Sequence, residues 1–280
     1  MKTQLYFLGF GLLFLISSCK QEEVGPTYFD VLTTTQDENF AESLFDDANF
    51  ESDKQVSNYE TTLEKSTNSD TIIITSNPGP NGYLDSAWQI TIDFGDSYTG
   101  RYGWVRKGKI IIDVKGFYKD SGSVRTMTFD NYYVNNNKVE GTHTVTNKGF
   151  DSTTMAYNYD VVVSDAKITT SDGKTITWNS SRTRSWTAGY DTPLISLDDV
   201  YKISGEAHGI NSEGKSFSKV ITQPLLLKMN CEYIQEGVVD LTIEDVPMAQ
   251  IDFGYTEGDI CDGYAQIHTK NNSHIILLGR

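Results

Sequence analysis

The chain has 280 residues, of which 38% are hydrophobic and 12% aromatic, and its formal net charge at pH 7 is -15. This composition is typical of a globular protein and argues against intrinsic disorder. An acidic surface of this size repels phosphate backbones, so we expect no nucleic acid among the partners. The length suits one large all-β domain or two smaller ones.

The start of the chain has the order of a secretion signal. Met1-Lys2 gives a positive start, Leu5 to Ile16 form a compact apolar segment, and Ser17-Ser18 are small residues before Cys19. The apolar segment is shorter than the ~20 residues that a membrane-spanning helix needs. We therefore predict a signal peptide over residues 1–18, with an uncleaved anchor helix or a buried helix as the alternative.

Leu15-Ile16-Ser17-Ser18-Cys19 resembles the lipobox of bacterial lipoproteins, in which the chain is cut before the cysteine and that cysteine is acylated. The resemblance implies lipidation of Cys19 and attachment to the outer membrane, because several acyl chains on one residue anchor stably. Lys20-Gln21-Glu22-Glu23 resembles the export signal of Bacteroidota-type surface lipoproteins. It implies display at the cell surface, with an anchor facing the periplasm as the alternative.

Three cysteines are present, and lipid on Cys19 leaves Cys231 and Cys261. An even pair in an oxidising compartment predicts a disulfide between them. A zinc site is the poorer interpretation, because no further Cys or His lies at ligand spacing. Phosphate-loop, dinucleotide, Gly-x-Ser-x-Gly and His-Glu-x-x-His motifs are missing from the sequence, so we predict neither a metal nor a cofactor.

One helix is predicted in the N-terminal part of the mature chain. Thr35 and Glu38 have the spacing of a capping box. Apolar residues follow at helical spacing, namely Phe40, Ala41, Leu44, Phe45 and Ala48. The pattern predicts a polar tether over 19–34, a short acidic helix over 35–51 that packs on a sheet, and a connector over 52–70. A helix that docks on a partner is the alternative.

From residue 71 to residue 280 the pattern changes to alternation with a period of two. Tyr157, Tyr159 and Val161, for example, fall on one face of a strand. Turn sequences such as Asn135-Asn136-Asn137 separate the candidate strands, and no helix-length apolar pattern lies between them. We predict an all-β domain, an antiparallel meander of long hairpins that forms a sandwich or a curved sheet.

A short internal repeat lies near the two ends of this domain. Ile92-Asp93-Phe94-Gly95 recurs as Ile251-Asp252-Phe253-Gly254. The repeat predicts a shared strand and turn, and calcium bound by Asp93 and Asp252 is the alternative.

Residues 85–280 resemble uncharacterised lipoproteins of the same bacterial group. The resemblance lies in Ile92 to Gly95, Arg106 to Lys109, the hairpin from Phe129 to Gly141, and Asp172-Gly173 with Thr177-Trp178. It implies no assigned activity.

The stretch from Lys174 to Trp186 is the best candidate binding surface. An unbroken strand would place Trp178, Arg182, Arg184 and Trp186 on one face. Aromatic rings stack on sugars and arginine forks bind carboxylates or sulfates, so this face suits an acidic glycan. The alternative is that the tryptophans pack in the core while the arginines stack on them or pair with acidic residues.

Charged residues elsewhere give weaker signals. A basic group is expected to complement the acidic helix within the molecule or to face an anionic membrane, and comprises Arg101, Arg106, Lys107, Lys109, Lys115 and Lys119. Glu206 and His208 are the best acid/base pair for a hydrolase. Asp198 and Asp199 look more like turn residues than a pair of glycosidase carboxylates.

The sequence therefore favours a non-catalytic surface lipoprotein with a binding or envelope-structural role. Its expected partners are the outer membrane, through the lipid, and a polysaccharide or another envelope protein. A glycan-binding lipoprotein that uses the Trp/Arg face is the first alternative. A hydrolase based on strand carboxylates is the second.

Overall fold

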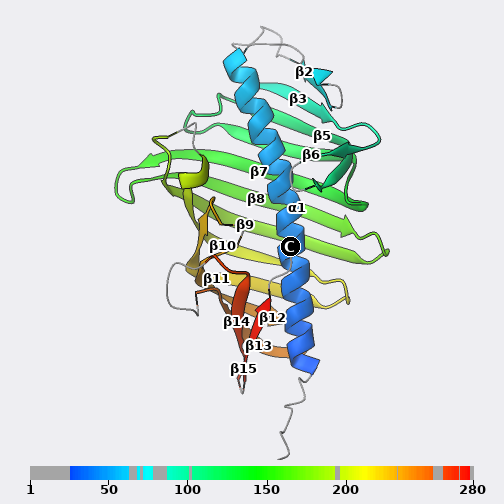
Figure 1. Cartoon of the computed structure of the whole chain (residues 1–280), viewed down its shortest axis with the longest axis vertical. Coiled ribbons are helices and arrows are strands. Elements are labelled where there is room, and N and C mark those ends of the chain that lie inside the picture. The colour runs from blue at the N-terminus through cyan, green and yellow to red at the C-terminus, as the bar shows by residue number, and fades with distance from the viewer. Residues whose placement is uncertain are drawn as a thin grey trace, which may run out of the picture.

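The computed structural model describes residues 26–62, 68–69, 72–77, 87–100, 103–192, 196–231, 233–254, 261–270 and 272–277. Within these residues, one long helix lies across one face of a single antiparallel sheet (Figure 1). We call the face that contacts the helix the inner face of the sheet, and the opposite face the outer face.

The helix α1 spans Pro26–Thr62. The first strands are β1 (Asn68–Ser69), β2 (Ile72–Asn77), β3 (Ala87–Asp93), β4 (Tyr98–Thr99), β5 (Val105–Lys115), β6 (Val124–Val134), β7 (Asn137–Asp151) and β8 (Ala156–Thr169). The later elements are β9 (Thr175–Ala188), the 3-10 helix η2 (Ser196–Asp198), β10 (Val200–Ile210), β11 (Ser216–Lys228), β12 (Glu236–Ile243), β13 (Val246–Asp252), β14 (Tyr264–His268) and β15 (Ser273–Leu277).

The described strands form one 15-stranded sheet in which each strand pairs with its neighbours along the chain. Only β4 leaves this order, since β3 pairs with β5 and β4 lies beside β5. The first and last strands do not pair with each other, so the sheet is open. The predicted antiparallel meander is confirmed. A helix, rather than a second sheet, covers the inner face.

The helix is much longer than the predicted segment 35–51, because it has 37 residues. Residues 26–34 of the predicted tether and 52–62 of the predicted connector are helical. The predicted signal peptide and Cys19 lie outside the described residues. No helix of the described residues combines the length and the apolar composition of a membrane span.

The predicted capping box is wrong because both of its residues lie inside the helix. The hydroxyl of Thr35 donates a hydrogen bond of 2.7 Å to the carbonyl oxygen of Val31, one turn earlier. Glu38 instead points at the sheet and pairs with Arg182 and Lys219. Thr35 and Glu38 therefore mark the buried face of α1 and not its start.

The hydrophobic core lies between α1 and the inner face. Leu44 and Phe45 of the helix are fully buried against strands whose inward side chains include Ile90 and Ile112. The ring of Phe45 lies 5.6 Å from the ring of Trp178 on β9, measured between centroids. Burial of these side chains is the main apolar contribution that holds the helix on the sheet.

Charged pairs run along the same interface, and we call them the ion-pair seam. They join α1 to the sheet as Asp30–Lys215, Glu38–Arg182, Glu38–Lys219, Glu42–Arg182, Asp47–Arg106 and Asp53–Arg125. Arg106, Arg125, Arg182 and Lys219 are buried. Burying one unpaired charge costs roughly several kcal/mol. These four cations therefore depend on their carboxylate partners on α1.

Among the described members of the basic group, the expected contact with the acidic helix is confirmed for Arg106. Its guanidinium donates hydrogen bonds of 2.9 and 2.5 Å to the two carboxylate oxygens of Asp47. Lys109 instead pairs with Asp93, and Lys107 lies over the ring of Tyr133. Arg101 lies outside the described residues.

The internal repeat forms the same turn twice. An oxygen of Asp93 accepts a hydrogen bond of 2.9 Å from the backbone N–H of Gly95, and Asp252 accepts one of 2.9 Å from Gly254. The phenylalanine between the aspartate and the glycine, Phe94 in one copy and Phe253 in the other, is buried. These carboxylates close turns, and the described residues hold no cluster of three or more potential metal ligands. The calcium alternative therefore has no support at these positions.

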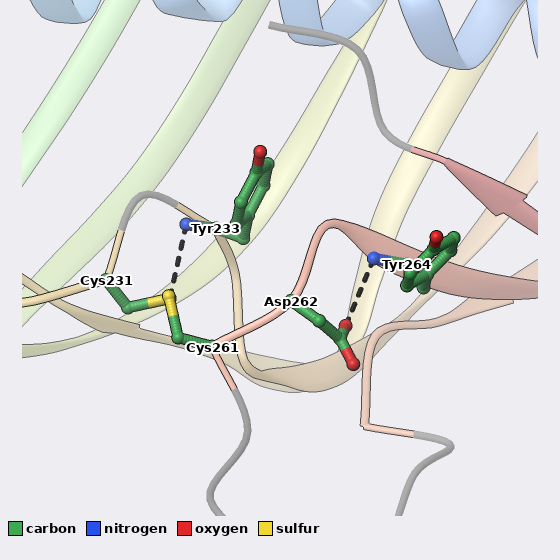
Figure 2. Close-up of a disulfide and its surroundings, with 5 residues drawn as sticks. All are labelled: Cys231, Tyr233, Cys261, Asp262 and Tyr264. Atoms are coloured by element: carbon green, nitrogen blue, oxygen red, sulfur yellow. Dashed lines mark hydrogen bonds between the residues drawn. A yellow bond between two sulfur atoms is a disulfide. The ribbon is translucent and has the colours of Figure 1, made fainter.

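The predicted disulfide between Cys231 and Cys261 is confirmed, with the two Cα atoms 5.5 Å apart. Figure 2 shows that it joins the segment after β11 to the segment that leads into β14. Closing a loop with a sequence separation of 30 residues contributes about 3–4 kcal/mol in the loop-entropy description. The bond thus ties the last strands to the rest of the sheet.

The first prediction concerns Glu38, at the centre of the ion-pair seam. Burial alone would raise the pKa of Glu38, but the positive charges of Lys219 and Arg182 hold that pKa below its ordinary value. Replacing Glu38 with Gln leaves the two buried cations Arg182 and Lys219 with one shared carboxylate, that of Glu42, instead of two. We expect the free energy of unfolding to fall by about 3–5 kcal/mol in a urea titration.

A matched control for this prediction is Glu140→Gln, which removes one partner of the partly exposed pair Lys138–Glu140. It should leave the midpoint of urea unfolding close to that of the unaltered protein, since exposed pairs contribute little. Equal effects of the two substitutions would contradict the importance of the seam.

The second prediction concerns His143, which is buried under α1 beside Phe45. Burial, with the positive charges of Arg125 and Arg184, lowers the pKa of His143 from 6.5 to about 3. The unfolded chain therefore binds more protons between these values, and stability falls as the pH drops below 6.5. Between pH 8 and pH 4.5 this group should remove about 2–3 kcal/mol of stability.

Urea titrations of His143→Gln at the same two pH values check this prediction. The comparison at pH 8 gives the packing cost of the substitution, because His143 is neutral there in both states. The loss on acidification should be smaller than in the unaltered protein by the stated amount. An unchanged loss would show that His143 is not the group responsible.

Candidate ligand-binding site

The strand β9 carries the predicted Trp/Arg face, and its register confirms that these side chains share the inner face. Inward residues of β8 and β10 lie directly opposite every one of the four residues, namely Trp178, Arg182, Arg184 and Trp186. The helix, however, divides the set. Trp178 is 2% exposed and Arg182 is 6% exposed.

Trp178 and Arg182 therefore do not reach a ligand, and their expected role in binding is wrong. Trp178 packs on Phe45, and the guanidinium of Arg182 lies 5.6 Å from the Trp178 ring centroid while it pairs with Glu38 and Glu42. For this half of the strand, the alternative of a core tryptophan and a paired arginine is correct.

Arg184 and Trp186 lie further along β9, where they are half-buried. Trp186 belongs to a group of rings in mutual contact, which we call the aromatic cluster. Its members are Phe150, Tyr157, Trp186, Tyr190 and Tyr201. Phe150 is exposed and the other four are half-buried. The cluster lies where β7 and β9 end and β8 and β10 begin, at one margin of the sheet (Figure 1).

Strand register builds the cluster. Tyr157 on β8 and Tyr201 on β10 both pair with Trp186 on β9, so three rings lie side by side on neighbouring strands. Trp186 and Tyr201 stack with ring centroids 5.9 Å apart and planes 21° apart. Phe150 on β7 pairs with Tyr157 and places its ring 5.0 Å away.

Tyr190 follows β9 in a tight turn that needs a glycine. Gly189 has a φ of 88°, and a Cβ there would lie 2.7 Å from the Cα of Asp199. The turn can therefore approach the segment after η2 closely. The ring of Tyr190 meets that of Trp186 edge to face, with their centroids 6.1 Å apart.

Asp199 fixes the edge of this cluster. Its carboxylate accepts a hydrogen bond of 3.1 Å from the indole N–H of Trp186 and one of 3.5 Å from the hydroxyl of Tyr201. Burial raises the pKa of Asp199, and the hydrogen bond from Trp186 partly offsets this. Two rings are thus held in fixed orientations by one carboxylate.

Arg184 differs from the other inward arginines. Its guanidinium carbon lies 4.3 Å from the ring centroid of Tyr201, and its Nε is buried without a hydrogen-bond partner. No ion pair joins it to a carboxylate of the described residues, whereas Arg106, Arg125 and Arg182 each pair with α1. The guanidinium of Arg184 therefore lies next to the stacked rings, and its charge acts on the nearby carboxylates of Asp46, Asp53 and Asp199.

The remaining catalytic candidates lie elsewhere. Glu206 and His208 are exposed on the outer face of β10. Asp198 accepts a hydrogen bond of 2.6 Å from the hydroxyl of Thr192, while Asp199 serves Trp186. The expected role of Asp198 and Asp199 as turn residues agrees with these contacts.

The sequence did not reveal four members of the cluster, namely Phe150, Tyr157, Tyr190 and Tyr201. The sequence held part of the information needed to find the cluster, because the period-two alternation placed Tyr157 on a defined face of its strand. Pairing Tyr157 with Trp186 requires the register shift between Val163 and Ala166, which no local pattern marks.

Comparisons with protein-family models, with curated proteins and with solved structures found no match to this chain.

Proposed function

We propose that this protein is a lipid-anchored, non-catalytic binding protein of the bacterial cell surface, and that its ligand is a carbohydrate. The N-terminal motif that ends in Cys19 supports the anchor. The aromatic cluster supports the binding role, and it is the observation that carries the proposal.

The cluster has the chemistry that carbohydrate recognition needs. Sugar rings present apolar faces that pack on the flat faces of tryptophan and tyrosine. Planar polar side chains at the rim of such a surface bind the sugar hydroxyls and fix the orientation. Here Asp199 and Arg184 lie in contact with Trp186 or Tyr201.

The ionic character of the sugar follows from Arg184. Arg184 forms no ion pair within the described residues, and the terminal N–H groups of a guanidinium bind carboxylates and sulfates. We therefore favour a glycan with acidic sugars over a neutral one. The pair Glu206 and His208 lies on the outer face, apart from the aromatic cluster, and gives a hydrolase no added support.

The third prediction separates the two tryptophans of β9. Trp186→Ala should weaken binding to an acidic polysaccharide by at least about tenfold, because it removes the central ring of the cluster. Trp178→Ala should instead lower the free energy of unfolding by about 3–5 kcal/mol, because it leaves a cavity under α1. Affinity electrophoresis in gels with alginate or dextran, together with urea titration, measures both effects.

Arg184→Met tests the acidic sugar in the same gels. If the Arg184→Met protein is no longer retarded in alginate gels but migrates as before in dextran gels, the result would support an acidic sugar as the ligand. If Trp186→Ala were retarded as strongly as the unaltered protein in every gel, the carbohydrate proposal would fail.

The fourth prediction concerns the anchor. Mass spectrometry of the native protein should find a mature chain that begins at Cys19 with acyl groups attached, and Cys19→Ser should leave the membrane fraction. A native chain that still begins at Met1 and carries no lipid would refute the anchor while leaving the binding site untested by that result.

A further inference from the structure

The last two strands present an exposed apolar surface on the outer face. Ile275 is 57% exposed and Leu277 is 60% exposed. Tyr264 on β14 pairs with Leu277 and is also exposed, while Gln266 pairs with Ile275. Tyr264, Ile275 and Leu277 therefore form one continuous patch, which we call the β15 patch.

The charge of these strands differs from that of the rest of the chain. The protein has 38 Asp and Glu residues, yet β14 and β15 contain none, and they contain no Lys or Arg either. Edge strands of soluble proteins are commonly protected by charged side chains or proline, because an open edge invites association. An uncharged edge with exposed apolar residues therefore indicates a surface that is covered in the cell.

The β15 patch lies at the end of the molecule where α1 begins. The ring of Tyr28 lies 4.9 Å from the imidazole of His274 on β15, measured between centroids. Phe29, the next residue, is itself exposed and contacts Tyr28. Figure 1 shows the first turns of α1 and the strands β14 and β15 at the same end of the sheet.

The length of chain before α1 limits the distance to the lipid. Seven residue steps separate Cys19 from Pro26, and even a fully extended chain of that length spans at most about 25 Å. If Cys19 is acylated, as the proposed function requires, the start of α1 stays within this distance of the bilayer surface. The apolar residues nearest to that start are then within reach of the membrane.

We propose that the β15 patch is a membrane-contact surface that rests on the lipid bilayer beside the acylated Cys19. This inference depends on the lipid anchor of the proposed function and assigns the orientation of the folded body on it. Apolar and aromatic side chains at the level of the lipid headgroups add to the affinity that acyl chains provide. The absence of carboxylates from β14 and β15 removes the charge that an anionic bilayer would repel.

The orientation has a geometric consequence for the site. The helix α1 has 37 residues and is therefore about 55 Å long. It leads from the membrane-contact surface across the sheet to its far end. The aromatic cluster lies on strands β7 to β10, between these ends, and so stands away from the bilayer.

Spin labels on the native, acylated protein test the inference. A nitroxide is attached to Ile275→Cys and, as a matched control, to Glu206→Cys, since Glu206 is also exposed on an outer face. The protein is reconstituted in vesicles of phosphatidylethanolamine and phosphatidylglycerol. Collision rates with oxygen and with a water-soluble nickel complex are then measured for both labels.

We expect the label at 275 to show a severalfold higher ratio of oxygen to nickel collisions than the label at 206. Equal ratios on membrane-bound, acylated protein would overturn the membrane contact and leave the anchor standing. Dipolar broadening between labels at 275 would also overturn it, because a second copy would then cover β15. Mass spectrometry of the same sample that shows an unmodified Cys19 would refute the proposed anchor itself.

Discussion

The buried charges between α1 and the sheet constrain the rest of this structure. The inner face carries Arg106, Arg125, Arg182 and Lys219 in positions where an apolar sheet would carry aliphatic residues. A buried cation is tolerated only with a well-placed carboxylate, and each of these four finds one on the helix. Without α1 the inner face of the sheet would hold four unpaired cations, so the sheet needs this helix to be stable.

The seam also sets the position of the helix along the sheet. Apolar contacts are non-directional, so they specify the position of α1 less sharply than ion pairs do against a shift by one turn, about 5.4 Å. Such a shift would separate Asp47 from Arg106, Asp53 from Arg125 and Glu38 from Arg182 together. Charge pairing with several strands thus gives one register of helix on sheet, as polar contacts do in coiled coils.

Much of the fold followed from the sequence, because alternation with period two is a local property that survives any tertiary arrangement. The helix ends did not follow, because its buried face carries acidic residues whose partners come from distant strands. Glu38 and Arg182, for example, are 144 positions apart. The binding site was only half predicted for a related reason. Trp186 could be placed on a face, but its neighbours Tyr157 and Tyr201 depend on strand register across β-bulges.

The separation in sequence between α1 and its partners bears on how the chain folds. The helix is synthesised first, while Lys215, which pairs with Asp30, follows 185 positions later. Contacts of such long range form late, since the intervening chain must be ordered before they close. During this delay a helix rich in carboxylates stays solvated and repels other nascent copies, whereas an apolar one would aggregate. The acidic character of α1 thus protects the nascent chain until the last strands have been made.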